Sequence, residues 1–165
     1  MITTRKSFFF AVVLLSCLVL ATEYFLDPNN EYIYATLEGF EAVYDEGDQS
    51  LSVINETMNI FLNIIKLTEP VEGLELEMLT EEIQKNLEAS GFRILSIDER
   101  DFQGYRATTY ETFAVQDNTP VRVEFLIFEV PNRGFYMILS AAPDESYDDL
   151  RMLISSAKQM IMFME

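Results

Sequence analysis

A strand–turn–strand–helix pattern in residues 120–164 constrains the fold of this 165-residue chain more than any other feature. From Val121 to Val130 apolar and polar residues alternate, and the second face turns apolar near its end, which predicts a central strand covered on both faces. Residues 131–134 (Pro-Asn-Arg-Gly) predict a turn, because proline presets φ and glycine tolerates positive φ. Residues 135–142 predict the return strand, which ends at Pro143 because proline has no N–H for the ladder.

The last twenty residues predict a helix that lies on this pair of strands. Asp144 or Ser146 can cap its start. Asp148 and Asp149 suit the positive end of its dipole. We interpret its continuous apolar stripe as core packing, with an adaptable methionine-rich binding surface as the alternative. The stripe has spacings of three and four and contains Tyr147, Leu150, Ile154, Ala157, Ile161 and Met164.

The preceding part of the chain predicts further strands and one more helix. Short strands are expected at 32–37, 40–44 and 51–54, and a longer one at 57–67. Thr80 is expected to cap the helix, and Gly91 suits the position just past its end. Strands at 92–97 and 104–115 follow, joined by a polar connection at 98–103.

Residues 1–21 predict an export signal or an N-terminal membrane anchor, because two basic residues precede an apolar run. Three fates are open: cleavage before Thr22, retention as an anchor, or lipidation of Cys17. Residues 14–17 (Leu-Leu-Ser-Cys) resemble a bacterial lipobox, although apolar residues follow Cys17 where a polar tether is usual. All three fates export the rest. We expect an extracytoplasmic, membrane-tethered protein, with free secretion as the second choice. Residues 22–31 are expected to be a linker and residues 32–165 a single domain.

The charge of the exported part restricts its partners. The chain has 11 basic and 28 acidic residues, and two of the basic ones, Arg5 and Lys6, lie in the leader. The rest therefore has nine basic residues against 28 acidic ones, a formal charge of −19. Such a surface repels phosphate backbones, so nucleic-acid binding is not expected. Basic proteins and divalent cations are the natural partners, and the alternative is that the acids only keep the domain soluble.

The residue types present exclude several chemistries. There is no histidine, and Cys17 is the only cysteine, so histidine-based catalysis, a zinc site and an intramolecular disulfide are not expected. A pair of carboxylates would suffice for a hydrolase, but among 28 acids some pair is always close. Calcium or manganese could bind acids at 45, 46 and 48 or at 98, 99 and 101, yet neither cluster has the EF-hand spacing. We expect no catalytic, cofactor or metal residues. A tyrosine-rich edge formed by Tyr32, Tyr34 and Tyr44 could bind a partner or simply pack at a rim.

Several short phrases in this order of elements carry a family resemblance. They are residues 90–94 (Ser-Gly-Phe-Arg-Ile), 104–108 (Gly-Tyr-Arg-Ala-Thr), 134–138 (Gly-Phe-Tyr-Met-Ile) and 141–143 (Ala-Ala-Pro). With them, residues 57–164 resemble the superfamily that includes the PsbP extrinsic proteins of photosystem II and the DcrB-like bacterial lipoproteins. The resemblance implies an α+β fold, an α/β/α sandwich in which helices flank a central, mostly antiparallel sheet. It implies no enzymatic activity, and no functional residue is carried over.

Taken together, the sequence predicts a non-enzymatic, exported, membrane-tethered accessory domain that binds a protein partner through an acidic surface. It predicts no cofactor, and it predicts contact with the membrane only through the N-terminal segment. One alternative is an accessory domain that binds calcium or manganese. The other is a carboxylate-dependent hydrolase.

Overall fold

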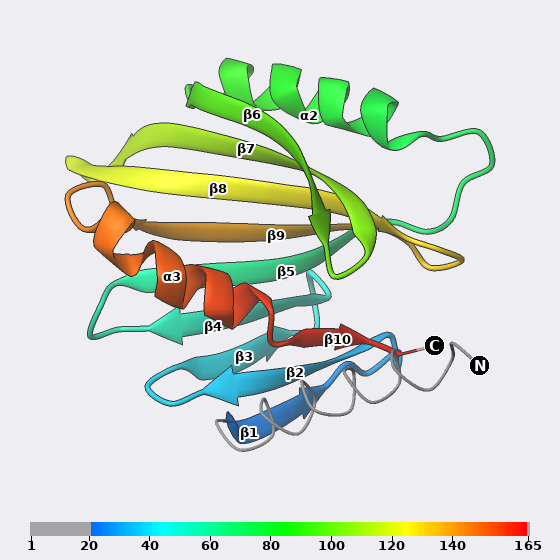
Figure 1. Ribbon diagram of the computed structural model, residues 1–165, viewed down its shortest axis with the longest axis horizontal. Helices are drawn as coiled ribbons and strands as arrows, with labels where there is room; N and C mark the ends of the chain where they lie inside the picture. Colours follow the sequence, from blue (N-terminus) through cyan, green and yellow to red (C-terminus); the bar gives the residue numbers. More distant parts are fainter. Residues whose placement is uncertain (1–20, 165) are drawn as a thin grey trace, which may run out of the picture.

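The computed structural model describes residues 21–164, which form two antiparallel sheets and two helices (Figure 1). A seven-stranded sheet has the order β3-β4-β5-β9-β8-β7-β6, and a three-stranded sheet has the order β1-β2-β10. The strands are β1 (Ala21–Leu26), β2 (Tyr32–Leu37), β3 (Glu41–Asp45), β4 (Ser50–Asn55), β5 (Ile60–Thr68), β6 (Arg93–Phe102), β7 (Tyr105–Gln116), β8 (Thr119–Val130), β9 (Gly134–Pro143) and β10 (Ile161–Phe163). The helices are α2 (Leu76–Ala89) and α3 (Tyr147–Lys158).

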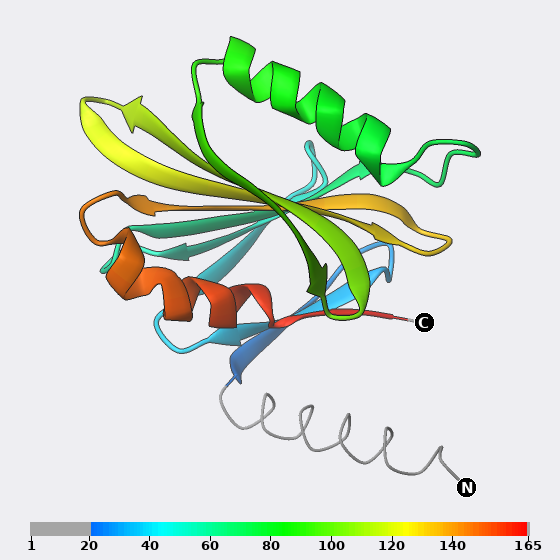
Figure 2. The same cartoon turned by 45° about the horizontal axis from the view of Figure 1, so that its top comes forward.

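The large sheet separates two hydrophobic clusters. Figure 2 shows α2 and α3 on its two opposite faces. On one face, Leu76 and Leu87 of α2 pack with Tyr110, Phe125 and Ile127 of the sheet. The larger cluster, on the other face, includes side chains from α3 and from the three-stranded sheet. The expected sandwich is therefore met in part: the sheet is antiparallel and each face carries one described helix, but a small second sheet shares one of the faces.

The long C-terminal hairpin is confirmed. Strand β8 lies between β7 and β9, and its side chains are buried on both faces from Val123 to Phe128. The turn to β9 uses positive φ at Asn132 (64°) and Gly134 (98°). A Cβ on Gly134 would lie 2.0 Å from the carbonyl oxygen of Thr68, so only glycine fits this close approach.

The prediction that the last helix continues to Met164 is wrong. Helix α3 ends at Lys158, and Ile161–Phe163 forms β10, which pairs with β2. The apolar spacing continues past the helix because Ile161 is buried in the same cluster from a strand instead. The Phe163 ring packs against Tyr32, Tyr105, Phe128 and Tyr136 at centroid distances of 4.8–6.0 Å, and these contacts favour the extended conformation.

Residues 22–31, expected to be a linker, contain strand β1 and the turn to β2. Residues 21–26 pair antiparallel with residues 33–37. The carboxylate of Asp27 is buried in the following turn and accepts hydrogen bonds from the backbone N–H groups of Asn29 (2.9 Å) and Glu31 (3.2 Å). The polar cluster after Leu26 is therefore a hairpin turn and not the end of a tether.

Helix α2 begins earlier than the sequence predicts. Its N-cap is Glu75, and Thr80 lies inside the helix, where its hydroxyl donates to the Glu77 carbonyl at 3.0 Å. The predicted end is confirmed: Gly91 has φ +87°, its N–H donates to Glu88 O, and the N–H of Phe92 donates to Leu87 O. This pair of bonds satisfies the last carbonyls of the helix.

The polar connection expected at 98–103 is mostly the second half of β6. Asp98 to Phe102 pair in register with Thr109 to Tyr105. Strand β6 is an edge strand of the large sheet, so charged residues can alternate there without being buried. The strands expected at 32–37, 40–44, 51–54, 57–67 and 104–115 all have counterparts, β2, β3, β4, β5 and β7.

The predictions for the leader, including lipidation of Cys17, lie outside the described residues. Within residues 21–164, neither helix is long and apolar enough to cross a bilayer.

Candidate functional site: a charged cleft beneath helix α3

A cleft of about 260 Å³ lies between α3 and the part of the large sheet formed by β6, β7 and β8. Alternation along β7 and β8 puts Thr109, Glu111 and Glu124 on the face that α3 covers. Glu111 and Glu124 are directly paired across the two strands, a placement that requires neutralising cations. The charged side chains that line the cleft and neutralise these acids are Arg100, Arg151 and Lys158.

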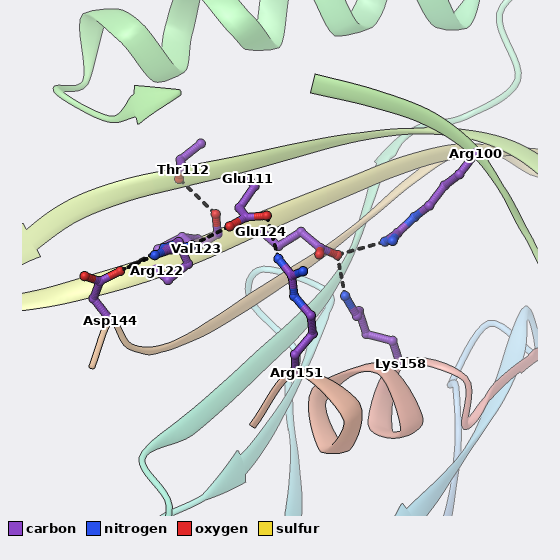
Figure 3. A network of polar contacts seen from close by, with 9 residues as sticks. All are labelled: Arg100, Glu111, Thr112, Arg122, Val123, Glu124, Asp144, Arg151 and Lys158. Carbon is purple, nitrogen blue, oxygen red and sulfur yellow. Dashed lines mark hydrogen bonds and ion pairs between the residues drawn. The ribbon is translucent and has the colours of Figure 1, made fainter. Parts of the chain in front are cut away.

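Glu124 is the centre of the cleft's ionic network (Figure 3). Only 8% of the residue is exposed, and its Oε1 accepts hydrogen bonds from Arg100 Nη2 at 2.9 Å and from Lys158 Nζ. Burial alone would raise the pKa of Glu124, but Lys158 and Arg100 outweigh burial and hold this pKa below its ordinary value of 4.5. Burial lowers the pKa of Lys158, even though Glu124 opposes the shift. The pKa values of both groups can be lowered at the same time. Glu124 has two cations as partners, whereas Lys158 lies near two further cations, Arg100 and Arg151, which disfavour its own positive charge.

Glu111 is neutralised from two sides. Its Oε1 accepts from Arg122 Nη1 at 2.5 Å and its Oε2 from Arg151 Nη2 at 2.8 Å. Arg122 also binds Asp144 Oδ1 through Nε (2.8 Å) and Nη2 (2.7 Å), which ties the start of α3 to β8 (Figure 3). The Tyr147 ring lies beneath both guanidinium groups, 5.3 Å from Arg122 and 5.8 Å from Arg151.

This arrangement is unsuited to carboxylate-based hydrolysis. A general acid at neutral pH needs a raised pKa, whereas the pKa of Glu124 is lowered by its two cations. Both oxygens of Glu111 are already hydrogen-bonded to arginines. Neither Glu111 nor Glu124 is therefore suited to act as the general acid of such a hydrolase.

The acidic clusters considered as metal sites have other partners. Asp45 Oδ1 accepts from the N–H groups of Gly47 (2.7 Å) and Asp48 (3.2 Å), which makes a turn. Asp101 Oδ1 accepts from the N–H of Gly104 at 2.9 Å, and Glu99 pairs with Arg106 at 3.2 Å. Among residues 21–164, no group of three or more histidine, cysteine or acidic side chains could hold a metal ion.

The tyrosines considered as a partner-binding edge are mostly core residues. Tyr32 and Tyr34 are buried, and the Tyr34 hydroxyl donates to the Ala157 carbonyl at 3.0 Å. The Tyr44 ring stacks on Phe25 with centroids 5.3 Å apart. These contacts agree with the alternative of ordinary packing.

Sequence reasoning missed the cleft, although it contained the signal. Arg122 and Glu124 are charged residues in a strand predicted to be covered on both faces, and such a strand can hold charges only as pairs. Lys158 adjoins the apolar stripe of the helix, so a buried cation opposite Glu124 was a possible inference. The sequence alone does not specify the strand register that brings Glu124 and Lys158 together.

A second candidate surface lies on the opposite side of the large sheet, on α2 (Figure 2). Residues 69–88 contain seven acidic residues and one basic residue, Lys85. Glu77 pairs with Arg106 and Glu69 with Lys66. The remaining acids of α2 and its N-cap are exposed, and Met78 among them has 47% of its surface exposed. The outer side of this helix is therefore an acidic face with an apolar side chain in it.

Comparison with known proteins gives a likeness of fold. No protein-family model and no curated protein sequence matches the chain. The solved structure of cyanobacterial PsbP (CyanoP) from Synechocystis sp. PCC 6803 is similar, with 14% identity, a TM-score of 0.56, and coverage of 88% of this chain and 94% of that one. LpqN of Mycobacterium tuberculosis, described as involved in cell envelope biogenesis, has 8% identity, a TM-score of 0.58, and coverage of 81% and 83%.

The Ran-binding protein Mog1p of Saccharomyces cerevisiae is similar as well, with 13% identity, a TM-score of 0.53, and coverage of 83% of this chain and 86% of that one. Identities this low relate folds and not activities. The likenesses confirm the predicted relationship in fold to PsbP.

Proposed function

We propose that this PsbP-like chain is a non-enzymatic accessory domain, exported and tethered to the membrane, that binds a protein partner through the acidic face of α2. The single observation that carries the proposal is the concentration of exposed acids on that helix. The same fold is found in a Ran-binding protein and in a protein of cell envelope biogenesis, so it is compatible with a binding role.

Helix α2 is held firmly enough to present a defined surface. Leu76 and Leu87 are buried against the sheet on its inner side. The buried hydroxyl of Tyr110 donates to the Thr80 carbonyl at 2.8 Å, which fixes the middle of the helix to β7. A partner with a basic surface would gain electrostatic attraction from Glu81, Glu82 and their neighbours, and apolar contact from Met78.

The tether would lie at the far end of the molecule from this face. Strand β1 begins at Ala21, directly after the apolar leader, and both views place the three-stranded sheet on the side opposite α2 (Figures 1 and 2). If Cys17 carried a lipid, three residues would separate it from β1. The small sheet would then face the membrane, and α2 would point away from it towards a partner.

Charge reversal on α2 tests the binding proposal. We expect the double variant Glu81→Lys/Glu82→Lys to lose a partner that the native chain retains when it is purified from detergent-solubilised membranes. The matched control is Glu46→Lys/Asp48→Lys, which makes the same charge change on the exposed turn between β3 and β4. Retention of the partner by the α2 variant, or equal loss in both variants, would argue against an interface on α2.

Mass spectrometry of the mature N-terminus tests the tether. An acylated Cys17 or an intact leader would support membrane attachment. A free N-terminus at Thr22 would replace the tether with secretion and leave the proposal for α2 unaffected.

A further inference from the structure

We propose that the cleft beneath α3 binds a small monoanion through one carboxylate or phosphate group, which Arg100, Arg151 and Lys158 would hold and Thr109 would orient. This site is separate from the acidic face of α2 and does not depend on the function proposed for it. Three independent observations point to such a ligand.

The cleft has more hydrogen-bond donors than acceptors. A guanidinium has five N–H groups and an ammonium three. Arg100 and Lys158 each make one hydrogen bond to a described residue, both to Glu124 Oε1, and Arg151 makes one to Glu111. Both oxygens of Glu111 are already occupied. The unused N–H groups of these three cations outnumber the free acceptors of the cleft, which include the Asp98 carboxylate and Glu124 Oε2, and an oxyanion would supply a further acceptor.

A buried hydroxyl in the cleft has no partner. Thr109 is 5% exposed, and its Oγ1 is fully buried without a hydrogen-bond partner among residues 21–164. An unmade hydrogen bond of this kind is destabilising, and native structures retain few of them. The same residue lines the cleft, so a rotation of its side chain about χ1 would let an oxyanion there accept a hydrogen bond from the hydroxyl. An ordered water would satisfy this hydroxyl but would leave the donor surplus in place.

Charge and size restrict the ligand to a small monoanion. Arg100, Arg122, Arg151 and Lys158 are four of the nine basic residues after the leader, and they surround three carboxylates, those of Glu111, Glu124 and Asp144. With a fourth carboxylate, Asp98, which also lines the cleft, the network is neutral, whereas the whole chain has a formal charge of −17. A neutral cleft in so acidic a molecule favours one added negative charge over two. The volume of about 260 Å³ is several times the roughly 30 Å³ of one water molecule.

Access to the site is open on one side. The side chains of Arg100 and Arg151 are 41% and 55% exposed, whereas that of Lys158 is 6% exposed. An anion would therefore meet the two arginines at the rim and Lys158 at the base.

The test uses the full chain in detergent, labelled with ¹⁵N, and two probes. At about pH 5.5 both probes are monoanions. Sodium acetate supplies a planar carboxylate and inorganic phosphate a tetrahedral anion, each exchanged against chloride at constant ionic strength. We expect saturable chemical-shift changes at the side-chain Nε–H groups of Arg100 and Arg151 with at least one probe. The probe that saturates identifies the class of anion.

Two variants separate binding from structure. Arg100→Gln leaves Glu124 paired with Lys158 and should weaken binding about tenfold or more, as expected for one lost charged hydrogen bond. Thr109→Val should weaken binding while leaving the melting temperature of the ligand-free protein unchanged or higher. The control is Arg106→Gln, an exposed arginine that pairs with Glu77 and Glu99, which should bind like the native chain.

Two results would overturn the proposal. One is the absence of saturation with both probes. The other is equal affinity in the Arg100 and Arg106 variants, which would make the network purely structural.

Discussion

At the scale of single residues, the most consequential side chain is Glu124, because two cations depend on it. Replacing Glu124 with glutamine leaves Lys158 buried without a carboxylate partner. Breaking a buried ion pair from one side costs about 3–5 kcal/mol. We expect a loss of this size in the free energy of unfolding, measured by urea denaturation. Glu99→Gln is the control, because that side chain is 65% exposed and exposed ion pairs contribute at most about 1 kcal/mol. Similar losses in both variants would contradict the role of Glu124.

The same residue predicts a pH dependence with a definite sign. Lys158 and Arg100 outweigh burial and hold the pKa of folded Glu124 below its ordinary value of 4.5. A carboxyl group whose pKa is lower in the folded state than in the unfolded state stabilises the fold. This stabilisation is complete above the unfolded-state pKa and is lost as the pH falls through the folded-state pKa. The difference in unfolding free energy between the native chain and Glu124→Gln should therefore shrink below pH 4.5. A difference that stays constant on acidification, or grows, would contradict this assignment.

Gly134 predicts a steric effect at a single Cβ. Alanine at this position would combine a φ of +98° with a Cβ only 2.0 Å from Thr68 O, so the β5 end or the hairpin must move. Gly73→Ala is the matched control, because Gly73 has φ +78° and no atom within 4 Å of the added Cβ. Backbone strain alone costs about 1–2 kcal/mol. We expect the melting temperature to fall clearly further for Gly134→Ala than for Gly73→Ala, and equal shifts would show that the close approach is relieved without cost.

At the scale of elements, sequence patterns predicted what local physics determines. The β8–β9 hairpin follows from alternation and from the turn chemistry of residues 131–134, and the end of α2 follows from Gly91. Sequence patterns failed where tertiary contacts decide. The apolar spacing of residues 147–164 fits one long helix, but Ile161–Phe163 instead form strand β10, which pairs with β2. The charged residues in the second half of β6 are typical of a loop. They fit a strand because β6 lies at the edge of the sheet, where its side chains can remain exposed.

Strand β10 is short, so the Phe163 side chain should supply much of its attachment. The ring contacts four aromatic side chains that belong to β2, β7, β8 and β9, and thereby joins the small sheet to the large one. Truncating a buried phenylalanine to alanine costs about 3–5 kcal/mol, and Phe163 is only partly buried, so we expect the lower end of that range. Hydrogen exchange should show the loss of protection concentrated in β2 and β10. Met152→Ala, at a residue 83% exposed, should change neither quantity.

At the scale of the whole molecule, the two candidate surfaces differ in how far sequence could predict them. The net negative charge and the acids of residues 69–88 are visible in the composition, and they predict an acidic surface without coordinates. The cleft is different, because it joins residues from β6, β7, β8 and α3 that are up to 62 positions apart in the sequence, from Ser96 to Lys158. The registers of β6, β7 and β8 place Arg100, Glu111 and Glu124 near one another, and the packing of α3 on the sheet adds Arg151 and Lys158.

The charge of the molecule also predicts how salt affects its stability. Exposed acids far outnumber exposed bases, so their mutual repulsion destabilises the folded state and is screened by added salt. The ion pairs of Glu124 and Lys158 are buried and are screened much less. Raising sodium chloride from about 0.05 to 0.5 M should therefore raise the melting temperature. Screening worth about 1 kcal/mol corresponds to about 2–4 °C for a chain of this size. A melting temperature that falls with salt would mean that attractive surface pairs, such as those of Arg106 with Glu77 and Glu99, outweigh the repulsion, and the Arg106→Gln variant would then lose that dependence.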